Sequence, residues 1–422
     1  MKTWNTQTIA DLGKVVTGKT PPSSNPEQFG DKYPFITPSD IEWGAKPVET
    51  ERALSEKGKE AHQRILLPRK SVCVVCIASI GKVCFTSEDS VTNQQINSII
   101  VDAKKHDPDF VFYLASLLRS TLEAYAGGAA TPIVNKGSFS NIKVQVPERN
   151  IQRKIAAILT AYDGLIETNK RRIALLEKMA EELYREWFVR MRFPGYQDAE
   201  FVKGVPQSWE IVRVDSLGRV VTGKTPSTKV PKYYGGNIPF IKTPDMHGNM
   251  FLTATEETLS EDGMRSQPSQ TIPARSLCVS CIGTGGVVSI TTTISQTNQQ
   301  INSLCLNRTE DLEWGYHVLR GLKETILLFG GTGATMTNLS KGKYSGLELL
   351  SPPVELRDKF HSLAEPIFSE AQTLATTNST LYQARDLLLP RLISGKLSVE
   401  DLDIQFPPSM LEEPADPEPA HA

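Results

Sequence analysis

The stretch Val15-Val16-Thr17-Gly18-Lys19-Thr20-Pro21 returns 205 residues later as Val220-Val221-Thr222-Gly223-Lys224-Thr225-Pro226. A second stretch, Thr92-Asn93-Gln94-Gln95-Ile96-Asn97-Ser98, returns unchanged at the same offset, beginning at Thr297. Between these stretches, residues 54–58 and 71–77 also have partial copies at residues 259–263 and 276–282. A solenoid unit spans roughly 20–50 residues. The much longer period therefore predicts a duplicated module of domain size.

A long helical pattern follows each module. Apolar residues recur at spacings of three and four, which predicts one apolar stripe on each helix. The stripe of the first copy holds Ile151, Ile155, Ile158, Tyr162, Leu165, Ile173, Leu176, Met179, Leu183 and Trp187. The stripe of the second copy holds Phe360, Leu363, Ile367, Leu374, Leu381, Leu388 and Leu392. A stripe of this length needs a partner, and the other copy can supply it.

Two further expectations concern these helices. Pro366 and Pro390 predict a kink or an end in the second helix, because proline lacks the N–H that the helix needs. The alternative in which each helix folds back on its own module remains open. Periods sustained over several heptads favour the coiled coil.

Together these patterns predict an α+β fold in which two long antiparallel helices, forming a coiled-coil spacer, separate two duplicated mixed α/β globular domains. We expect the first module at residues 1–149 and the first helix at 150–193. We expect the second module at residues 194–354 and the second helix at 355–397. Residues 398–422 form an acidic, proline-rich tail whose composition predicts disorder.

Composition narrows the class of protein. The 422 residues are 39% hydrophobic and 22% charged, as in soluble globular proteins. We see no apolar run near the roughly 18–20 residues that span a bilayer. The N-terminus lacks the apolar core of a signal peptide. These features predict a cytoplasmic protein without membrane contact.

The net charge of −2 conceals an uneven distribution. Seven of the 48 acidic residues lie in residues 399–422, which hold no Lys or Arg. The rest of the chain therefore carries 41 acidic residues against 46 Lys and Arg. A folded part with this excess of positive charge permits a nucleic-acid partner without demanding one.

The six cysteines include two Cys-x-x-Cys pairs, Cys73/Cys76 and Cys278/Cys281. A zinc ribbon would place such pairs about 15–20 residues apart, whereas these are 205 apart. Both pairs lie in apolar runs typical of buried strands, where a spacing of three puts two side chains on opposite faces. We predict reduced cysteines in the core and no metal site.

Two copies of a phosphate-loop pattern, residues 13–20 and 218–225, fit G-x-x-x-x-G-K-[ST]. That loop needs a helix starting at its lysine. Here Pro21-Pro22 or Pro226 follows the last threonine, and the segment after it does not continue as a helix. We favour a polar turn leaving a strand, with an exposed lysine and hydroxyls suited to phosphate oxygens of a nucleic-acid backbone. An ordinary solvated turn is the alternative.

Catalytic patterns give no convincing match. Ser351-Pro352-Pro353-Val354 is similar to the Pro-Pro loop of amino-methyltransferases, but Val354 stands where an aromatic residue should stack on a flipped base. We interpret it as a connection from a strand to a helix. No Ser-His-Asp set and no pair of carboxylates stands out, so we predict a chain that is not an enzyme.

The order of module, long helix, module, long helix resembles the specificity subunit of type I restriction–modification systems. The resemblance covers the chain from Trp4 to about Leu397. Its carriers are residues 34–40 and 239–245, the segment Ile80-Gly81-Lys82-Val83, the two Thr-Asn-Gln-Gln-Ile-Asn segments, and residues 146–156. Each motif alone is modest, and their doubled order is specific.

The resemblance implies that each module is a target-recognition domain that reads one half of a split DNA sequence. It implies that the helices set the gap and dock two methyltransferase subunits. Double-stranded DNA, those two subunits and a motor-nuclease subunit are then the expected partners. No cofactor is expected in this chain, and S-adenosylmethionine is expected in the methyltransferase subunits, which methylate adenine.

The two copies differ where reading is expected. Residues 41–48 have no likeness to residues 246–253, and residues 129–136 differ from 332–339. We therefore predict two different half-sites, because base-edge contacts come from variable segments while shared segments hold the fold and the phosphates. Lys82 becomes Val287 in the second copy, so the second module is expected to lack one backbone contact.

The candidate DNA-binding residues come from both shared and variable segments. In the first module they are Thr17, Lys19, Thr20, Trp43, Lys46, Lys82, Asn135 and Lys136. In the second module they are Thr222, Lys224, Thr225, Lys242, His247, Asn249, Thr335, Asn338 and Lys341. Asn93, Gln94, Asn298 and Gln299 could bind adenine edges, but identical residues cannot explain different specificities, and a structural role is favoured for them.

Three other functions remain to be weighed. They are a nucleotide-driven enzyme with a phosphate loop, a self-contained methyltransferase, and a coiled-coil scaffold that binds only protein. Sequence-selective DNA binding in an assembled complex would exclude the scaffold.

Overall fold

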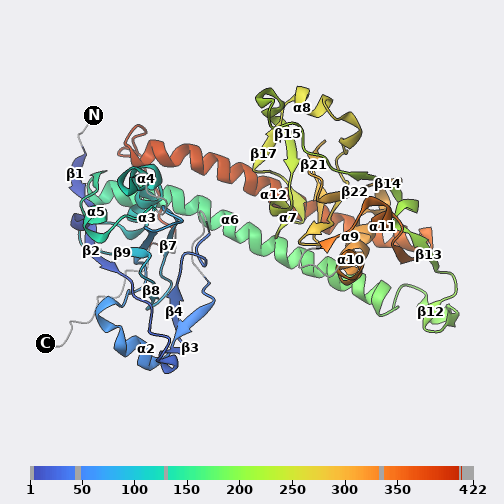
Figure 1. The fold of residues 1–422 in the computed structure, drawn as a ribbon, viewed down its shortest axis with the longest axis horizontal. Coiled ribbons are helices and arrows are strands. Elements are labelled where there is room, and N and C mark those ends of the chain that lie inside the picture. The colour runs from blue at the N-terminus through green and yellow to red at the C-terminus, as the bar shows by residue number, and fades with distance from the viewer. Residues whose placement is uncertain (1–3, 43–48, 128–131, 332–336, 408–409, 411–422) are drawn as a thin grey trace. The chain divides into compact units, whose positions relative to one another are not determined.

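The computed structural model describes residues 4–42, 49–127, 132–331, 337–407 and 410. The chain divides into two compact units. Unit 1 comprises Met1–Leu165 and Tyr382–Ala422, and unit 2 comprises Ile166–Leu381. The two longest helices, α6 (Arg149–Tyr184) and α12 (Val354–Ile393), each contribute to both units (Figure 1).

Unit 1 is built around a sheet with strand order β2-β9-β6-β7. Its strands are β2 (Gly13–Thr17), β9 (Ile96–Val101), β6 (Val72–Val75) and β7 (Val83–Phe85). All its neighbours are antiparallel. A second sheet has the order β3-β5-β4-β8, with β3 (Phe29–Gly30), β5 (Arg52–Leu54), β4 (Tyr33–Ile36) and β8 (Val91–Thr92). The edge pair β1 (Asn5–Thr8) and β10 (Lys143–Val146) leads into α6.

The short helices of unit 1 are α1 (Ile9–Leu12), α2 (Glu56–Ala61), α3 (Pro108–Ser116), α4 (Arg119–Ala126) and α5 (Lys136–Ser140). Strand β6 is buried on both faces. Val72 and Val74 belong to the core that includes α3, while Cys73 and Val75 pack with Ile36 of the second sheet. This alternation follows from the two-residue period of a strand and explains why the run carries no polar side chain.

Unit 2 repeats the plan. Its main sheet has the order β14-β22-β18-β20-β16, with β14 (Gly218–Thr222), β22 (Ile301–Leu306), β18 (Leu277–Ser280), β20 (Val288–Thr291) and β16 (Phe251–Leu252). The second sheet is β17-β15-β21, with β17 (Glu257–Leu259), β15 (Tyr234–Ile241) and β21 (Gln296–Thr297). Smaller pairs join β11 (Phe201–Val202) to β12 (Val205–Pro206), β13 (Glu210–Arg213) to β24 (Glu348–Ser351), and β19 (Ile282–Gly283) to β23 (Thr337–Asn338). Its short helices are α7 (Thr243–Met246), α8 (Glu261–Arg265), α9 (Leu312–Gly321), α10 (Lys323–Gly330) and α11 (Lys341–Ser345).

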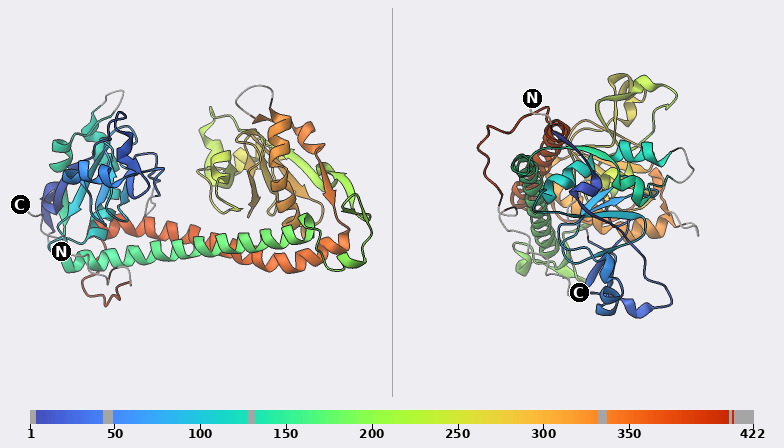
Figure 2. Two further views of the ribbon diagram at one scale, coloured as in Figure 1. Left: turned by 90° about the horizontal axis from the view of Figure 1, so that it is seen from below. Right: turned by 90° about the vertical axis from the view of Figure 1, so that its left-hand side faces the viewer.

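The helices α6 and α12 run antiparallel. In unit 1 Asp163 pairs with Arg385, and in unit 2 Arg172 pairs with Glu370, so the partner's number falls as the number on α6 rises. Figures 1 and 2 both draw the two helices side by side. The predicted coiled coil is confirmed, and the alternative in which each helix packs on its own module alone is wrong.

Three details of the helices differ from expectation. Leu165, Met179 and Leu363, which the sequence placed on the stripes, are 48%, 58% and 51% exposed, because they lie one position away from the heptad positions that are buried. Neither Pro366 nor Pro390 ends its helix, since α12 continues to Ile393. A missing N–H removes a single hydrogen bond, which a helix packed along its length can tolerate. After Tyr184, α6 continues as a π-helical turn over Arg185–Val189.

The predicted burial of the cysteines is confirmed. All six cysteines are free and buried, and the two members of each Cys-x-x-Cys pair belong to different cores. Burial raises the pKa of the Cys76 and Cys281 thiols to about 11, which keeps them protonated at neutral pH. No helix in the described ranges is long and apolar enough to cross a membrane.

Candidate nucleic-acid interface

The two repeated motifs meet at one end of the main sheet in each module. The first motif leaves β2 or β14, and the second enters β9 or β22, which is its antiparallel neighbour. Thr17 therefore faces Asn97, and Thr222 faces Asn302. The sheet brings together two segments that are about 75 residues apart in the chain because strand register, not sequence distance, decides which residues become neighbours.

Two hydroxyl groups in each module tie the motifs together. Thr17 Oγ1 donates to Asn97 Oδ1 at 2.6 Å, and Thr20 Oγ1 donates to Gln94 Oε1 at 2.7 Å. The second module repeats both bonds at 2.6 and 2.8 Å, from Thr222 to Asn302 and from Thr225 to Gln299. We call this set the polar platform. Its members are Thr17, Lys19, Thr20, Gln94 and Asn97 in the first module and Thr222, Lys224, Thr225, Gln299 and Asn302 in the second.

Backbone bonds rule out the phosphate-loop interpretation. The N–H groups of Gly18 and Lys19 donate to Ile96 O at 3.2 Å and Thr92 O at 2.9 Å. The N–H groups of Gly223 and Lys224 donate to Ile301 O at 3.0 Å and Thr297 O at 2.9 Å. A phosphate loop needs these donors free for phosphate oxygens. The next helical turns begin only at Pro26 and Pro231, so no helix starts at either lysine.

The exposed members of the platform are Lys19, Gln94, Lys224, Thr225 and Gln299. Asn93 and Asn298 lie beneath it, each 8% exposed. Asn93 Oδ1 accepts from the N–H of Gln95 at 3.0 Å, and Asn298 repeats this with Gln300 at 3.1 Å. The structural role favoured for the asparagines agrees with this geometry. The glutamines stay at the surface with their carbonyl oxygens already occupied.

Gly18 tests how tightly the platform is built. A Cβ on Gly18 would lie 2.2 Å from the carbonyl oxygens of both Thr92 and Asn93. We expect Gly18→Ala to lower the free energy of unfolding by about 1–3 kcal/mol through overpacking against backbone that cannot move aside. Urea unfolding of the full chain measures this.

Gly164→Ala is the matched control, because its Cβ would meet nothing within 4 Å and it lies inside α6. We expect a gain of about 0.5–1 kcal/mol from helix propensity. Equal stabilities for Gly18→Ala and the unaltered chain would show that the two motifs do not approach as closely as described.

Backbone hydrogen bonds join the segments that carry further candidate residues to the same end of each main sheet. The Cys76 N–H donates to Gln95 O at 2.8 Å, and the Val134 N–H donates to Cys76 O at 2.9 Å, which joins the segment before α5 to the platform. In the second module the Cys281 and Leu339 N–H groups make the same two bonds, at 2.7 and 2.9 Å. Asn135, Lys136, Asn338 and Lys341 are all exposed on these segments.

Several predicted contacts are already occupied inside the protein. Lys82 Nζ donates to Pro38 O at 3.1 Å, and Lys242 pairs with Glu257 at 2.5 Å, and both lysines are half-buried. Asn135 Oδ1 caps α5 by accepting from the N–H of Ser138 at 2.9 Å. His247 and Asn249 are exposed on the loop after α7. Trp43, Lys46 and Thr335 lie outside the described residues.

Asp40 and Asp245 were not among the predicted site residues, yet they bind backbone on both sides of the variable loops. Asp245 accepts from the N–H of Lys242 at 2.7 Å and of Glu256 at 3.0 Å, so one carboxylate joins both ends of the loop. Asp40 makes the same two bonds, with Thr37 at 2.7 Å and Glu51 at 3.1 Å. The recurrence of Pro-x-Asp or Pro-Asp at both sites was the available signal.

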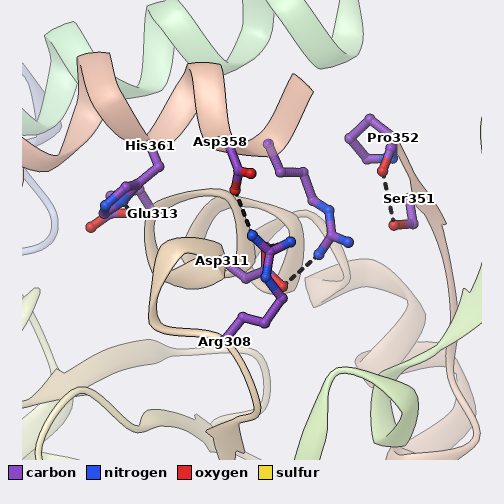
Figure 3. A network of polar contacts seen from close by, with 8 residues as sticks. Arg308, Asp311, Glu313, Ser351, Pro352, Asp358 and His361 are labelled. Atoms are coloured by element: carbon purple, nitrogen blue, oxygen red, sulfur yellow. Dashed lines mark hydrogen bonds and ion pairs between the residues drawn. The ribbon is translucent and has the colours of Figure 1, made fainter. Parts of the chain in front are cut away.

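The Ser-Pro-Pro segment is the expected strand-to-helix connection. Ser351 ends β24, is 8% exposed, and donates from Oγ to Pro352 O at 3.3 Å (Figure 3). α12 begins at Val354. In the described part of the chain, no group of three or more His, Cys, Asp or Glu residues could hold a metal ion.

Comparison with known proteins adds independent findings. The family described as "Type I restriction modification DNA specificity domain" matches residues 1–178 and 206–356. The HindI specificity subunit of Haemophilus influenzae is 30% identical over 355 residues, 69% of this chain and 77% of that protein. The MjaIX specificity subunit of Methanocaldococcus jannaschii is 27% identical over 418 residues, 95% of both chains.

Among solved structures, the S subunit of a type I restriction–modification system from M. genitalium is similar, with a TM-score of 0.57. The alignment covers 92% of this chain and 96% of that one at 14% identity. A likeness at this identity shows a shared fold.

Proposed function

This chain belongs to the family of type I restriction–modification DNA specificity proteins, and on that premise we propose that each module binds one half of a split double-stranded DNA target. One observation carries the proposal. The polar platform is the same in both modules, down to its hydrogen bonds, while the loops around it differ. A common platform fits the common backbone of DNA, and differing loops fit differing bases.

The exposed platform residues supply the backbone contacts in this proposal. Lys19 and Lys224 bring a positive charge, and Gln94 and Gln299 bring amide N–H donors, at equivalent points of the two modules. Phosphate oxygens accept from both kinds of group. The loop that carries His247 and Asn249 reads bases in the second module, and residues 41–48 do so in the first. The half-sites are therefore different, as their loops are.

The chemistry is left to partner subunits. We propose that this chain catalyses nothing, holds no cofactor, and works with two methyltransferase subunits that bind S-adenosylmethionine, and with a motor-nuclease subunit. Leu165, Leu175 and Met179 of α6 are 48%, 62% and 58% exposed, and such apolar residues suit a partner surface. A protein that reads genomic DNA works where that DNA is, which agrees with the predicted cytoplasmic location.

Methylation mapping tests the function directly. The chain is co-expressed with its cognate methyltransferase subunit in a host free of adenine methylation, and N6-methyladenine is read by long-read sequencing. We expect a split motif with a fixed gap that disappears when this chain is omitted. An intact complex that leaves the DNA unmethylated would overturn the proposal.

Lysine substitutions separate the platform from the reading loops. We expect Lys19→Ala and Lys224→Ala each to weaken DNA binding by the assembled complex for all sequences alike, with the slope of log affinity against log salt falling by about one. Asn249→Ala is expected to relax preference at one half-site only. Titrations of fluorescent duplexes at several salt concentrations measure both effects. Lys178→Ala, exposed on α6, is the control and should change neither.

A further inference from the structure

The apolar seam of the helix pair follows strict heptads in unit 2. Spacings of four and three alternate along both helices, as coiled-coil seams require. The α6 seam holds Ile166, Asn169, Ile173, Leu176, Ala180, Leu183 and Trp187. The α12 seam holds Phe360, Ala364, Ile367, Ala371, Leu374, Asn378 and Leu381. The Trp187 and Phe360 rings, at opposite ends of these series, meet with centroids 5.8 Å apart.

One layer of this seam is polar. Asn169 Nδ2 donates to Asn378 Oδ1 at 2.9 Å, and Asn378 Nδ2 donates to Ile166 O at 3.2 Å. The two side chains are only 3% and 6% exposed. Each amide therefore depends on the other helix for its hydrogen bonds, and any pairing that removed the partner would leave a buried polar group unsatisfied.

The duplication makes this layer unusual. The residue equivalent to Asn169 in the second helix is Leu374, and the residue equivalent to Asn378 in the first helix is Ile173. Each helix thus carries one asparagine and one aliphatic residue in its two central seam positions, in opposite order. The Asn–Asn layer exists only when an α6 meets an α12, with Ile173 then opposite Leu374.

The rest of the α6 seam does not discriminate in this way. If two α6 helices paired antiparallel about the same centre, Ile166 would face Leu176, Tyr162 would face Ala180, and every flanking layer would remain apolar. Only the central layers would fail, because Asn169 of each copy would face Ile173 of the other. Two α12 helices would place Asn378 opposite Leu374 in the same manner. A slip of one heptad would move Asn169 opposite Ala371 or Arg385.

We infer that Asn169 and Asn378 are partner-selecting residues that make α6 pair with an α12, in one register, and that make each of these helices reject its own kind from a second copy. A polar residue at a single seam position is known to fix register and partner at some cost in stability. The selection of partner stands on the helices alone. The further consequence, that the fixed register sets the gap between half-sites, rests on the proposed function.

Chain exchange tests the selection. Two full-length copies with different affinity tags are co-expressed, and capture through one tag is followed by quantification of the other. We expect the unaltered chain to bring down little of the second copy. The variant Asn169→Leu with Asn378→Leu, in which the two central layers are apolar in every pairing, is expected to bring down at least about tenfold more, because the free-energy penalty of an unsatisfied amide is gone.

A second variant tests whether exchange depends on satisfied asparagines or only on a more apolar seam. Ile173→Asn with Leu374→Asn adds the missing amides, so that like helices could also satisfy every asparagine. We expect this variant to exchange as well, although its seam is less apolar. If neither symmetric variant exchanges more than the unaltered chain while thermal unfolding shows both folded, the inference is overturned. The chain-exchange assay contains no DNA, so a negative result there would not count against the proposed function. In the same way, a negative result in methylation mapping would not count against partner selection by the two asparagines.

Discussion

Arg357→Met is expected to lower the free energy of unfolding by about 3–5 kcal/mol, because it removes the one cation that is hydrogen-bonded to the buried carboxylate of Asp311 in the described part of the chain. Asp311 is 3% exposed and Arg357 is 8% exposed. Arg357 Nη1 lies 2.5 Å from Asp311 Oδ2, and its guanidinium also lies 5.2 Å from the centre of the Trp314 ring. Arg308 lies 3.9 Å from Asp311, too far to take over this bond. Thermal and urea unfolding of the variant measure the loss.

The matched control is Arg172→Met, which removes the Arg172–Glu370 pair between α6 and α12. Its partners are 2.7 Å apart but 54% and 45% exposed. Solvent screening limits such a pair to about 0–1 kcal/mol. A double variant, Arg357→Met with Asp311→Asn, is expected to recover part of the loss because no charge remains buried. Equal losses from Arg357→Met and Arg172→Met would contradict the argument.

The Arg357→Met deficit is also expected to depend on pH. Burial raises the pKa of Asp311 above its usual value, and the charge of Arg357 opposes that rise. Without Arg357 the folded-state pKa climbs further. The loss of stability caused by Arg357→Met is then present at neutral pH. It shrinks as the pH falls toward the pKa that Asp311 has in the unfolded chain, because Asp311 becomes protonated in the folded variant.

His317 is expected to make unit 2 sensitive to mild acid. The imidazole is 4% exposed, stacks on Tyr184 at 5.0 Å between ring centres, and lies 5.8 Å from the ring of Phe368. Burial lowers its pKa to about 3, with the charge of Arg320 acting in the same direction. The neutral ring fits this environment, and its Nε2 has no hydrogen-bond partner in the described part of the chain.

The lowered pKa of His317 decides how stability changes with pH. The unfolded chain binds a proton at His317 below about pH 6.5, whereas the folded chain resists protonation until about pH 3. Stability is complete above pH 6.5 and is lost as the pH falls through this window. The expected slope is about 1.4 kcal/mol per pH unit, or about 2 kcal/mol between pH 6.5 and 5.

His317→Phe should remove that slope while retaining a flat ring against Tyr184. The difference between the two unfolding curves isolates the contribution of His317 from that of other groups. His247→Ala removes an exposed histidine of the same unit and should leave the slope unchanged. Parallel pH profiles for the unaltered chain and His317→Phe would show that His317 does not stay neutral on folding.

Local sequence patterns were enough to predict the two modules, the long helices and the buried strands. The duplication, the heptad spacing and the alternation of buried strands each report which face of a segment is covered, and that property is written in a few neighbouring residues. The prolines after Thr20 and Thr225 likewise argued against a phosphate loop, because the segments that they open do not continue as the helix that the loop would need.

Contacts between distant segments could not be read in this way. The platform threonines were expected to offer their hydroxyls outward, whereas they donate to Asn97, Gln94, Asn302 and Gln299. Lys82 and Lys242 were expected at the interface, yet they are held by Pro38 and Glu257. No local sequence pattern predicts these partners, because they come from other strands and loops whose placement depends on the whole sheet.

The sequence by itself determined that there are two modules, two long helices with an apolar stripe, and a set of buried, reduced cysteines. Only the tertiary structure decided that Asn169 meets Asn378, 209 residues away, and that one carboxylate joins both ends of each variable loop. The physical reason is that hydrophobic periodicity fixes what is buried, whereas hydrogen-bond partners depend on register between elements, which is set by packing of the complete chain.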